Sequence, residues 1–218
     1  MQGNDIKKIK NLMDIYNSSD QAERYLRAKT NKLSLNREYS VVFSNLHYDF
    51  NNKKVMALDI GCNSGRYVAG LLGREIDTIG IDSALIPLKL ASENYGPRFV
   101  RASATDLPFK RNVFDIIICI ELLHHLNDNC LKAALSHINY SLKPGGVFIF
   151  DIKNKFNFPL WYTYKRKDNN VFPLKARTIS GITELIRQYG FTIEEKKGIF
   201  FPIALFAPYV VIFAKKIN

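Results

Sequence analysis

A length of 218 residues, with 47% hydrophobic and 23% charged side chains, predicts one folded domain with a full core and excludes disordered or collagen-like proteins. Three cysteines are too few for a disulfide framework, and the absence of a CxxC pair argues against a metal site, so we expect no bound metal. The net charge of +11 comes from the two ends, because residues 55–150 hold nine Lys/Arg and nine Asp/Glu. Basic ends suit an anionic acceptor, an acidic membrane surface or RNA, and a solvated lysine-rich surface fits equally well.

Residues 1–50 have helical apolar spacing and precede the first strand, which predicts a helical cap on a domain formed by residues 51–218. They contain no apolar signal-peptide core, so a cytoplasmic protein is expected. Tyr16 and Tyr25 in this cap are candidates to close over a substrate, with core packing as the alternative.

The middle of the chain alternates short apolar runs with amphipathic stretches, which is the pattern of an α/β fold with a mostly parallel sheet and helices on both faces. Two more apolar runs near the C-terminus would complete that sheet. Strands are predicted at 55–60, 76–81, 98–102, 114–120, 146–152, 191–197 and 208–216, and helices at 65–73, 84–94, 129–142 and 178–189.

The strongest local signal is LDIGCNSGRY, where an apolar strand turns into a helix at Leu58–Tyr67. A ligand with a nucleoside and a charged amino-acid tail needs close approach to the backbone, and Gly61 and Gly65 provide a turn without side chains. Asp59 at the strand end is placed to meet an ammonium group. A tight turn between strand and helix is the structural alternative.

A second carboxylate follows the next strand, at Asp82, seventeen residues after Gly65. An acidic residue at this place grips a ribose diol in nucleotide-binding α/β folds. The structural alternative for Asp82 is a helix cap before Ala84.

DIGCNSG, GIDSA, ATDLPF, FDIIICIELLHHL and LKPGG occur in this order over roughly residues 50–152. In this they resemble the class I S-adenosylmethionine-dependent methyltransferases, and more narrowly the methyltransferase type 11 branch with its ubiquinone/menaquinone-type members. The resemblance implies a Rossmann-like seven-stranded sheet whose last strand is antiparallel, and S-adenosyl-L-methionine as cofactor. The candidate cofactor residues are Asp59, Gly61, Cys62, Asn63, Gly65, Asp82, Ser83, Ser103, Ala104, Thr105, Cys119, Ile120 and Glu121.

Two positions depart from the family pattern. Asn63 replaces the middle glycine, and because asparagine tolerates left-handed backbone, we expect the turn to be kept. Ser103 stands where an acidic residue usually holds the adenine amino group, so we expect a weaker grip on adenine or compensation from Thr105 or Asp106.

His124 and His125 follow the fourth strand. Methyl transfer depends mainly on alignment, and a base is needed only where the acceptor must lose a proton. His124 is the candidate catalytic base, His125 a candidate substrate contact and Glu121 a lesser candidate base. The structural alternative is that this segment packs and caps the next helix.

The C-terminal part holds two unusual stretches. Residues 153–177 predict a long insert that shapes the acceptor site, and its WYTYKRK, with Trp161 as a substrate-binding candidate, would suit stacked bases with phosphates or a solvated loop. The apolar run at 198–209 is expected in the core, with an apolar acceptor pocket or a membrane-facing patch as alternatives. A transmembrane helix is disfavoured because Pro202 and Pro208 interrupt a run that is too short.

The sequence therefore predicts a methyltransferase that acts on a small-molecule acceptor of lipophilic or anionic character. Methylation of tRNA or another RNA, which the basic ends permit, remains an alternative. A non-catalytic binding protein that kept the fold is the alternative from another class, motivated by Asn63 and Ser103.

Overall fold

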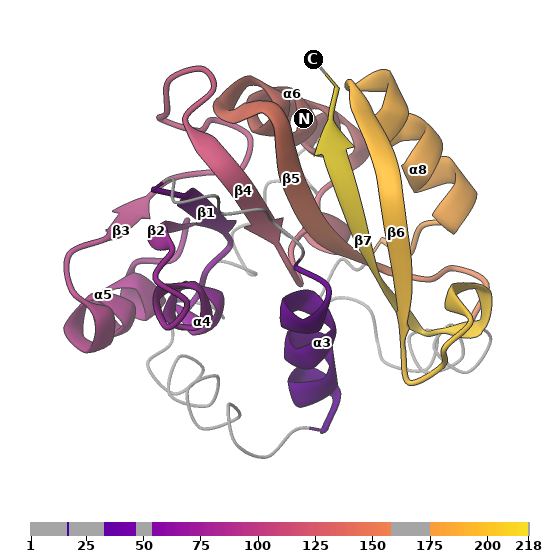
Figure 1. Ribbon diagram of the computed structural model, residues 1–218, viewed down its shortest axis with the longest axis horizontal. Coiled ribbons are helices and arrows are strands. Elements are labelled where there is room, and N and C mark those ends of the chain that lie inside the picture. The colour runs from indigo at the N-terminus through magenta and orange to yellow at the C-terminus, as the bar shows by residue number, and fades with distance from the viewer. Residues whose placement is uncertain (1–16, 18–32, 47–53, 158–174, 218) are drawn as a thin grey trace.

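The computed structural model describes residue 17 and residues 33–46, 54–157 and 175–217, which form one seven-stranded sheet flanked by helices (Figure 1). The strands are β1 (Met56–Ile60), β2 (Asp77–Asp82), β3 (Phe99–Arg101), β4 (Phe114–Cys119), β5 (Leu142–Lys153), β6 (Phe191–Ile199) and β7 (Tyr209–Lys216). The helices are α3 (Leu33–Ser44), α4 (Arg66–Leu72), α5 (Leu85–Tyr95), α6 (Asp128–Ser141) and α8 (Ile179–Gln188), with 3-10 turns η1 (Leu123–His125) and η2 (Ala204–Phe206).

The strand order is β3-β2-β1-β4-β5-β7-β6. Parallel pairing joins β3 through β5, and β7 runs antiparallel to both β5 and β6. The Rossmann-like fold class is thus confirmed, including the antiparallel last strand. One boundary differs: β5 starts at Leu142, four residues earlier than predicted, because Leu142 pairs with Phe114 across a shift in register.

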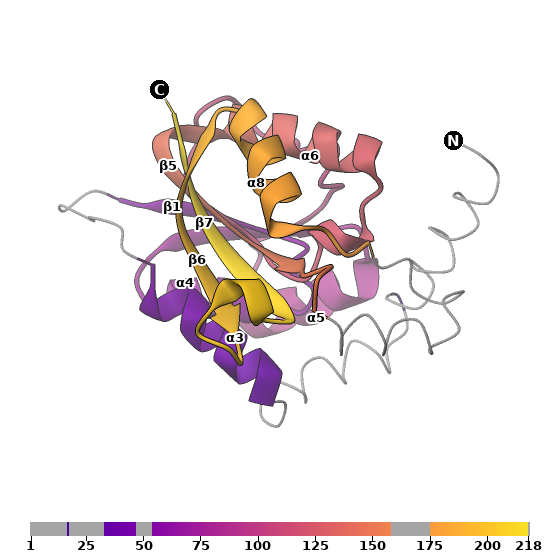
Figure 2. The ribbon, with the colours of Figure 1, turned by 90° about the vertical axis from the view of Figure 1, so that its right-hand side faces the viewer.

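Both faces of the sheet are covered, which is why the central strand β4 is buried along its whole length and is apolar at every position except Asp115. One core lies beneath α6 and α8 and includes Ile117 and Phe150. The other lies on the face of α3 and α4 and includes Ile118 and Tyr67. Figure 2 shows the two helix layers on opposite sides of the sheet.

Only part of the predicted N-terminal cap is described. Its α3 packs Val42 and Phe43 into the core beside Tyr67, so a helix of this region does cover the sheet. Tyr16, Tyr25 and Trp161 lie outside the described residues, as do residues 158–174 of the predicted insert. Among the described residues, no helix is long and apolar enough to cross a membrane.

The prediction that residues 198–209 lie in the core is wrong for their middle. Ile199 and Ala207 are buried, whereas Phe201, Ile203 and Phe206 are more than half exposed. The reason is geometric: β6 ends at Ile199 and β7 begins at Tyr209, so the intervening chain extends past the end of the sheet (Figure 1).

Candidate functional site

The bend between β1 and α4 is held by backbone hydrogen bonds to the neighbouring strand. The N–H groups of Gly61 and Cys62 donate to the Ile81 carbonyl at 2.8 and 2.9 Å. Gly61, Asn63 and Gly65 have φ angles of 76°, 48° and 81°, all in the left-handed region. Asn63 therefore keeps the turn as expected, and its Oδ1 accepts the Ser64 N–H at 2.7 Å.

Asp82 faces this bend. Its Oδ2 accepts the Asn63 N–H at 2.9 Å, while its Oδ1 accepts the Ala84 N–H at 2.9 Å at the start of α5. Asp82 therefore bonds both the bend and Ala84, the N-cap residue of α5, and its contact with a ribose diol stays a prediction. Burial raises the pKa of this carboxyl, and the three backbone N–H groups around it oppose the rise.

The two glycines have a packing role that the sequence did not reveal. A Cβ placed on Gly61 would lie 3.2 Å from the Leu122 side chain, and one on Gly65 would lie 3.0 Å from the rings of Tyr95 and Phe99. Glycine thus lets the edge of β4 and the α5–β3 segment close onto the bend, in addition to exposing backbone to a ligand.

Asp59, the last polar residue of β1, is 2% exposed. Its Oδ2 has no hydrogen-bond partner among the described residues. Burial, followed by the charge of Asp82, raises the pKa of Asp59 to about 8. A buried carboxylate oxygen without a donor fits a cationic or hydrogen-bond-donating ligand group beside the bend.

Ser83, Ser103, Ala104 and Thr105 lie around the same edge. In the parallel pairing of β2 with β3, Arg101 is the register partner of Asp82, so the turn that follows β3 begins beside the end of β2 that carries Asp82. The hydroxyls of Ser103 and Thr105 are 2.8 Å apart, and the Thr105 N–H donates to Ser103 Oγ at 3.2 Å. Whether this hydroxyl pair replaces the usual acidic side chain toward adenine stays a prediction.

The edge of β4 carries a charged cluster that sequence reasoning found only in part. Cys119 and Ile120 are buried, and Glu121 takes a left-handed φ of 60° while its N–H donates to Asp151 Oδ1 at 2.6 Å. The Lys153 ammonium pairs with the Glu121 carboxylate and lies 3.9 Å from Asp151 Oδ2. Asp151 and Lys153 were not predicted as site residues. The two charges at alternate positions of the otherwise apolar run FIFDIK could have indicated them, because both side chains then lie on the same face of the strand.

Helix α3 adds a buried acid to this region. Glu38 is 5% exposed, accepts a hydrogen bond from the Tyr67 hydroxyl at 2.7 Å and lies 3.8 Å from the Arg66 guanidinium. Burial raises the pKa of Glu38 to about 8, assisted by the charges of Glu121 and Asp151. The cap and the edge of β4 are therefore coupled electrostatically.

The two histidines lie in η1, with ring centroids 4.2 Å apart. His124 is 2% exposed, and burial lowers its pKa well below the usual value. Burial also lowers the pKa of His125 to about 4. Both rings are therefore neutral near pH 7, as a base must be, but His124 is enclosed by protein, which favours a packing role.

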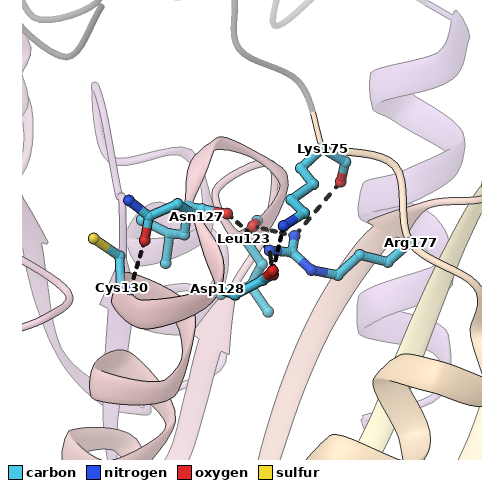
Figure 3. Close-up of polar contacts among 7 residues, drawn as sticks. Leu123, Asn127, Asp128, Cys130, Lys175 and Arg177 are labelled. Atoms are coloured by element: carbon cyan, nitrogen blue, oxygen red, sulfur yellow. Dashed lines mark hydrogen bonds and ion pairs between the residues drawn. The ribbon is translucent and has the colours of Figure 1, made fainter. Parts of the chain in front are cut away.

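Basic residues that follow the undescribed part of the insert fix η1 in place (Figure 3). The Arg177 guanidinium donates to the carbonyls of Leu123 and Leu126, each at 2.8 Å. Lys175 and Arg177 also pair with Asp128 at the start of α6, at 2.5 and 3.6 Å. Asp128, Lys175 and Arg177 line a cavity of about 280 Å³ together with Lys155 and the N-terminal turn of α8.

The described residues contain no group of three or more His, Cys, Asp or Glu side chains able to hold a metal ion. The site is instead a glycine-rich bend, two acidic strand ends and a charged cluster on one sheet edge. Residues 58–150 match the methyltransferase domain family.

Solved structures share the fold of the matched region and of the elements that flank it. A SAM-dependent methyltransferase of Thermotoga maritima superposes with a TM-score of 0.69 at 20% identity, covering 90% of this chain and 95% of that one. Magnesium protoporphyrin IX methyltransferase of Synechocystis, which holds bound SAH, gives a TM-score of 0.68 at 18% identity, covering 93% and 97%. At these identities the likeness concerns the fold.

Sequence relatives match over part of this chain. The human mitochondrial protein named arginine-hydroxylase NDUFAF5 is 44% identical over 107 residues, covering 47% of this chain. This chain spans 30% of the length of that protein.

Proposed function

We propose that this protein is an S-adenosylmethionine-dependent methyltransferase whose acceptor is a small or lipophilic molecule. The observation that carries the proposal is the Asp82 carboxylate, which is bound to the Asn63 N–H and so held against a left-handed, glycine-rich bend. The match of residues 58–150 to a methyltransferase domain supports it.

The residues present fit the cofactor. Asp82 retains carboxylate lone pairs for a ribose diol, and Asp59 has a buried oxygen without a hydrogen-bond partner among the described residues, suited to an ammonium group. We propose that the hydroxyls of Ser103 and Thr105, which lie 2.8 Å apart, meet the adenine. Cys119, Ile120 and Glu121 would flank the methionine half from the edge of β4. When bound, the cofactor supplies an electrophilic methyl group on a sulfonium.

The protein's own contribution to the reaction is then alignment and control of charge. Glu121 is the group best placed to meet an acceptor, because its carboxyl is partly exposed and is held by Lys153. The enclosed ring of His124 makes it a weaker candidate for a base than its sequence position indicated. We propose that α3, the ends of the 153–177 insert and the 198–209 segment surround the acceptor.

Two measurements test the proposal. Calorimetry with S-adenosylhomocysteine should give binding in the micromolar range, with at least a roughly tenfold loss in Asp82→Asn. Incubation with methyl-labelled S-adenosylmethionine and cell extract should then place label in the small-molecule or organic-soluble fraction. No binding at millimolar ligand would contradict the assignment and support a non-catalytic protein. Binding without transfer would separate this chain from methyltransferases, a needed distinction because one relative is named a hydroxylase.

The second candidate is an RNA methyltransferase, which the basic ends of the chain favour: residues 151–218 hold twelve Lys/Arg against five Asp/Glu. Label in RNA, with retention that falls steeply as salt rises, would support this candidate over ours. Retention unchanged by salt would count against it.

A further inference from the structure

Six exposed apolar side chains gather beyond the ends of β5 and β6. Elsewhere among the described residues, large exposed apolar side chains are scattered. We call this group the apolar patch: Phe156 (67% exposed), Phe200 (39%), Phe201 (52%), Ile203 (60%), Leu205 (55%) and Phe206 (60%). Apolar surface gathered in this way marks an interaction site, since single exposed apolar residues are ordinary but clusters are not.

The two segments of the apolar patch are joined into one surface. The Asn154 side-chain amide donates to the carbonyls of Leu205 and Ala207 at 2.8 and 3.0 Å, and the Asn157 amide donates to the Phe206 carbonyl at 2.8 Å. The Asn154 N–H also donates to the Pro208 carbonyl at 2.9 Å. The loop is thus anchored on the end of β5.

These same hydrogen bonds give several backbone groups of the loop a partner within the protein. Four consecutive carbonyls, from Leu205 to Pro208, accept donors of Asn154 or Asn157, and the N–H groups of Phe206 and Ala207 donate within η2. Backbone polar groups that already have partners do not need water, so these four carbonyls and two N–H groups can enter an apolar medium without losing hydrogen bonds.

Cations border the apolar patch. The Arg37 guanidinium lies 5.0 Å from the centre of the Phe200 ring, and Lys155 is exposed beside Phe156. The sequence from residue 151 onward carries a net charge of +7. Apolar and aromatic side chains bordered by Lys and Arg are the composition of a surface that binds anionic lipid. The same positive charge would repel a second copy of the chain.

We propose that the apolar patch docks on an anionic lipid bilayer. The patch lies at the carboxyl ends of β5 and β6. Lys153 at the end of β5 pairs with the Glu121 carboxylate, and its ammonium lies 4.0 Å from the centre of the ring of Tyr209, the first residue of β7 after the patch. Docking would bring the edge of the sheet that carries the candidate site close to the lipid surface. The proposal stands without methyl transfer, because it depends on the patch alone.

The test is flotation of the full chain with vesicles of phosphatidylcholine, alone or mixed in about equal parts with phosphatidylglycerol. The wild type should float with the anionic vesicles and less with the neutral ones, and Lys155→Gln should lower the anionic preference. The double variant Leu205→Ser/Phe206→Ser should lose about tenfold or more in vesicle partitioning. Both changed side chains are more than half exposed, so its melting temperature should stay near that of the wild type.

Ile217→Ser is the matched control, because Ile217 is 54% exposed but follows β7 at the opposite end of that strand from the patch. It should float as the wild type does. No flotation of the wild type, equal loss in the control, or a dimer in light scattering that the double variant abolishes would each overturn the proposal. Affinity for S-adenosylhomocysteine, measured on the same variants, should be unchanged, so failure here can be told from failure of the methyltransferase assignment.

Discussion

The Asp82 carboxylate binds the bend and the start of α5 at once, so a neutral amide in its place should disturb both. In Asp82→Asn, the NH2 group faces one of the two backbone N–H groups that the carboxylate accepts. We expect a loss of about 1–3 kcal/mol in the free energy of unfolding, measured in urea, beside the loss of cofactor affinity. Asp77→Asn, at the other end of β2, is the control and should have little effect on affinity. Equal affinity in wild type and Asp82→Asn would contradict the site.

Asn63 allows a test of backbone conformation separate from charge. Because it sits at φ 48°, Asn63→Ala should lower stability by about 1–2 kcal/mol, through the left-handed strain and the lost bond to Ser64. Asn63→Gly should keep the turn and bind S-adenosylhomocysteine within about threefold of the wild type. Differential scanning calorimetry and binding on both variants check this. A glycine variant that loses as much affinity and stability as the alanine variant would show that the side chain, and not the turn, matters.

At the scale of elements, α3 places a buried carboxyl against the charged cluster at the edge of β4. The folded pKa of Glu38 is about 8 and the reference value is 4.5, so the folded state holds a proton that the unfolded state has released between these values. The stability that this group contributes is full below pH 4.5 and is lost as the pH rises through 8.

The stability of the Glu38→Gln variant relative to the wild type should therefore rise with pH. Between about pH 5 and 8, the difference in unfolding free energy between Glu38→Gln and the wild type should shift toward the variant by up to about 1.4 kcal/mol per pH unit. Urea midpoints across that range measure it. Glu38→Ala, which leaves the Tyr67 hydroxyl without this partner, should add a pH-independent loss of about 1–3 kcal/mol. A flat difference for the glutamine variant would mean that Glu38 is ionised at neutral pH.

At the scale of the whole molecule, two cores on opposite faces of the sheet meet at β4. Ile117 is fully buried there, so Ile117→Ala should cost about 2–5 kcal/mol in urea unfolding. Ile193→Ala on the edge strand β6, where the side chain is only half-buried, is the matched comparison and should cost less. Similar losses at both positions would contradict the central place of β4.

The sequence alone determined the order and type of the elements, the bend at Gly61–Gly65 and the acidic end of β2. These features are local, since apolar periodicity, glycine spacing and strand ends lie within a few residues of one another. The parallel order of the strands then brings Asp59, Asp82 and Glu121 to one edge, which the family resemblance already implied.

Tertiary structure alone decided which side chains meet across the sheet. Glu38 lies in α3, Tyr67 in α4, and Asp151 and Lys153 in β5, so their burial and pairing depend on how these three elements pack together, with α3 contacting β6 and β7. The exposure of residues 200–206 depends likewise on where β6 ends. The sequence does not distinguish an apolar run that is buried from one that is exposed. Hydrophobicity is a property of the residue itself, whereas burial depends on which residues surround it.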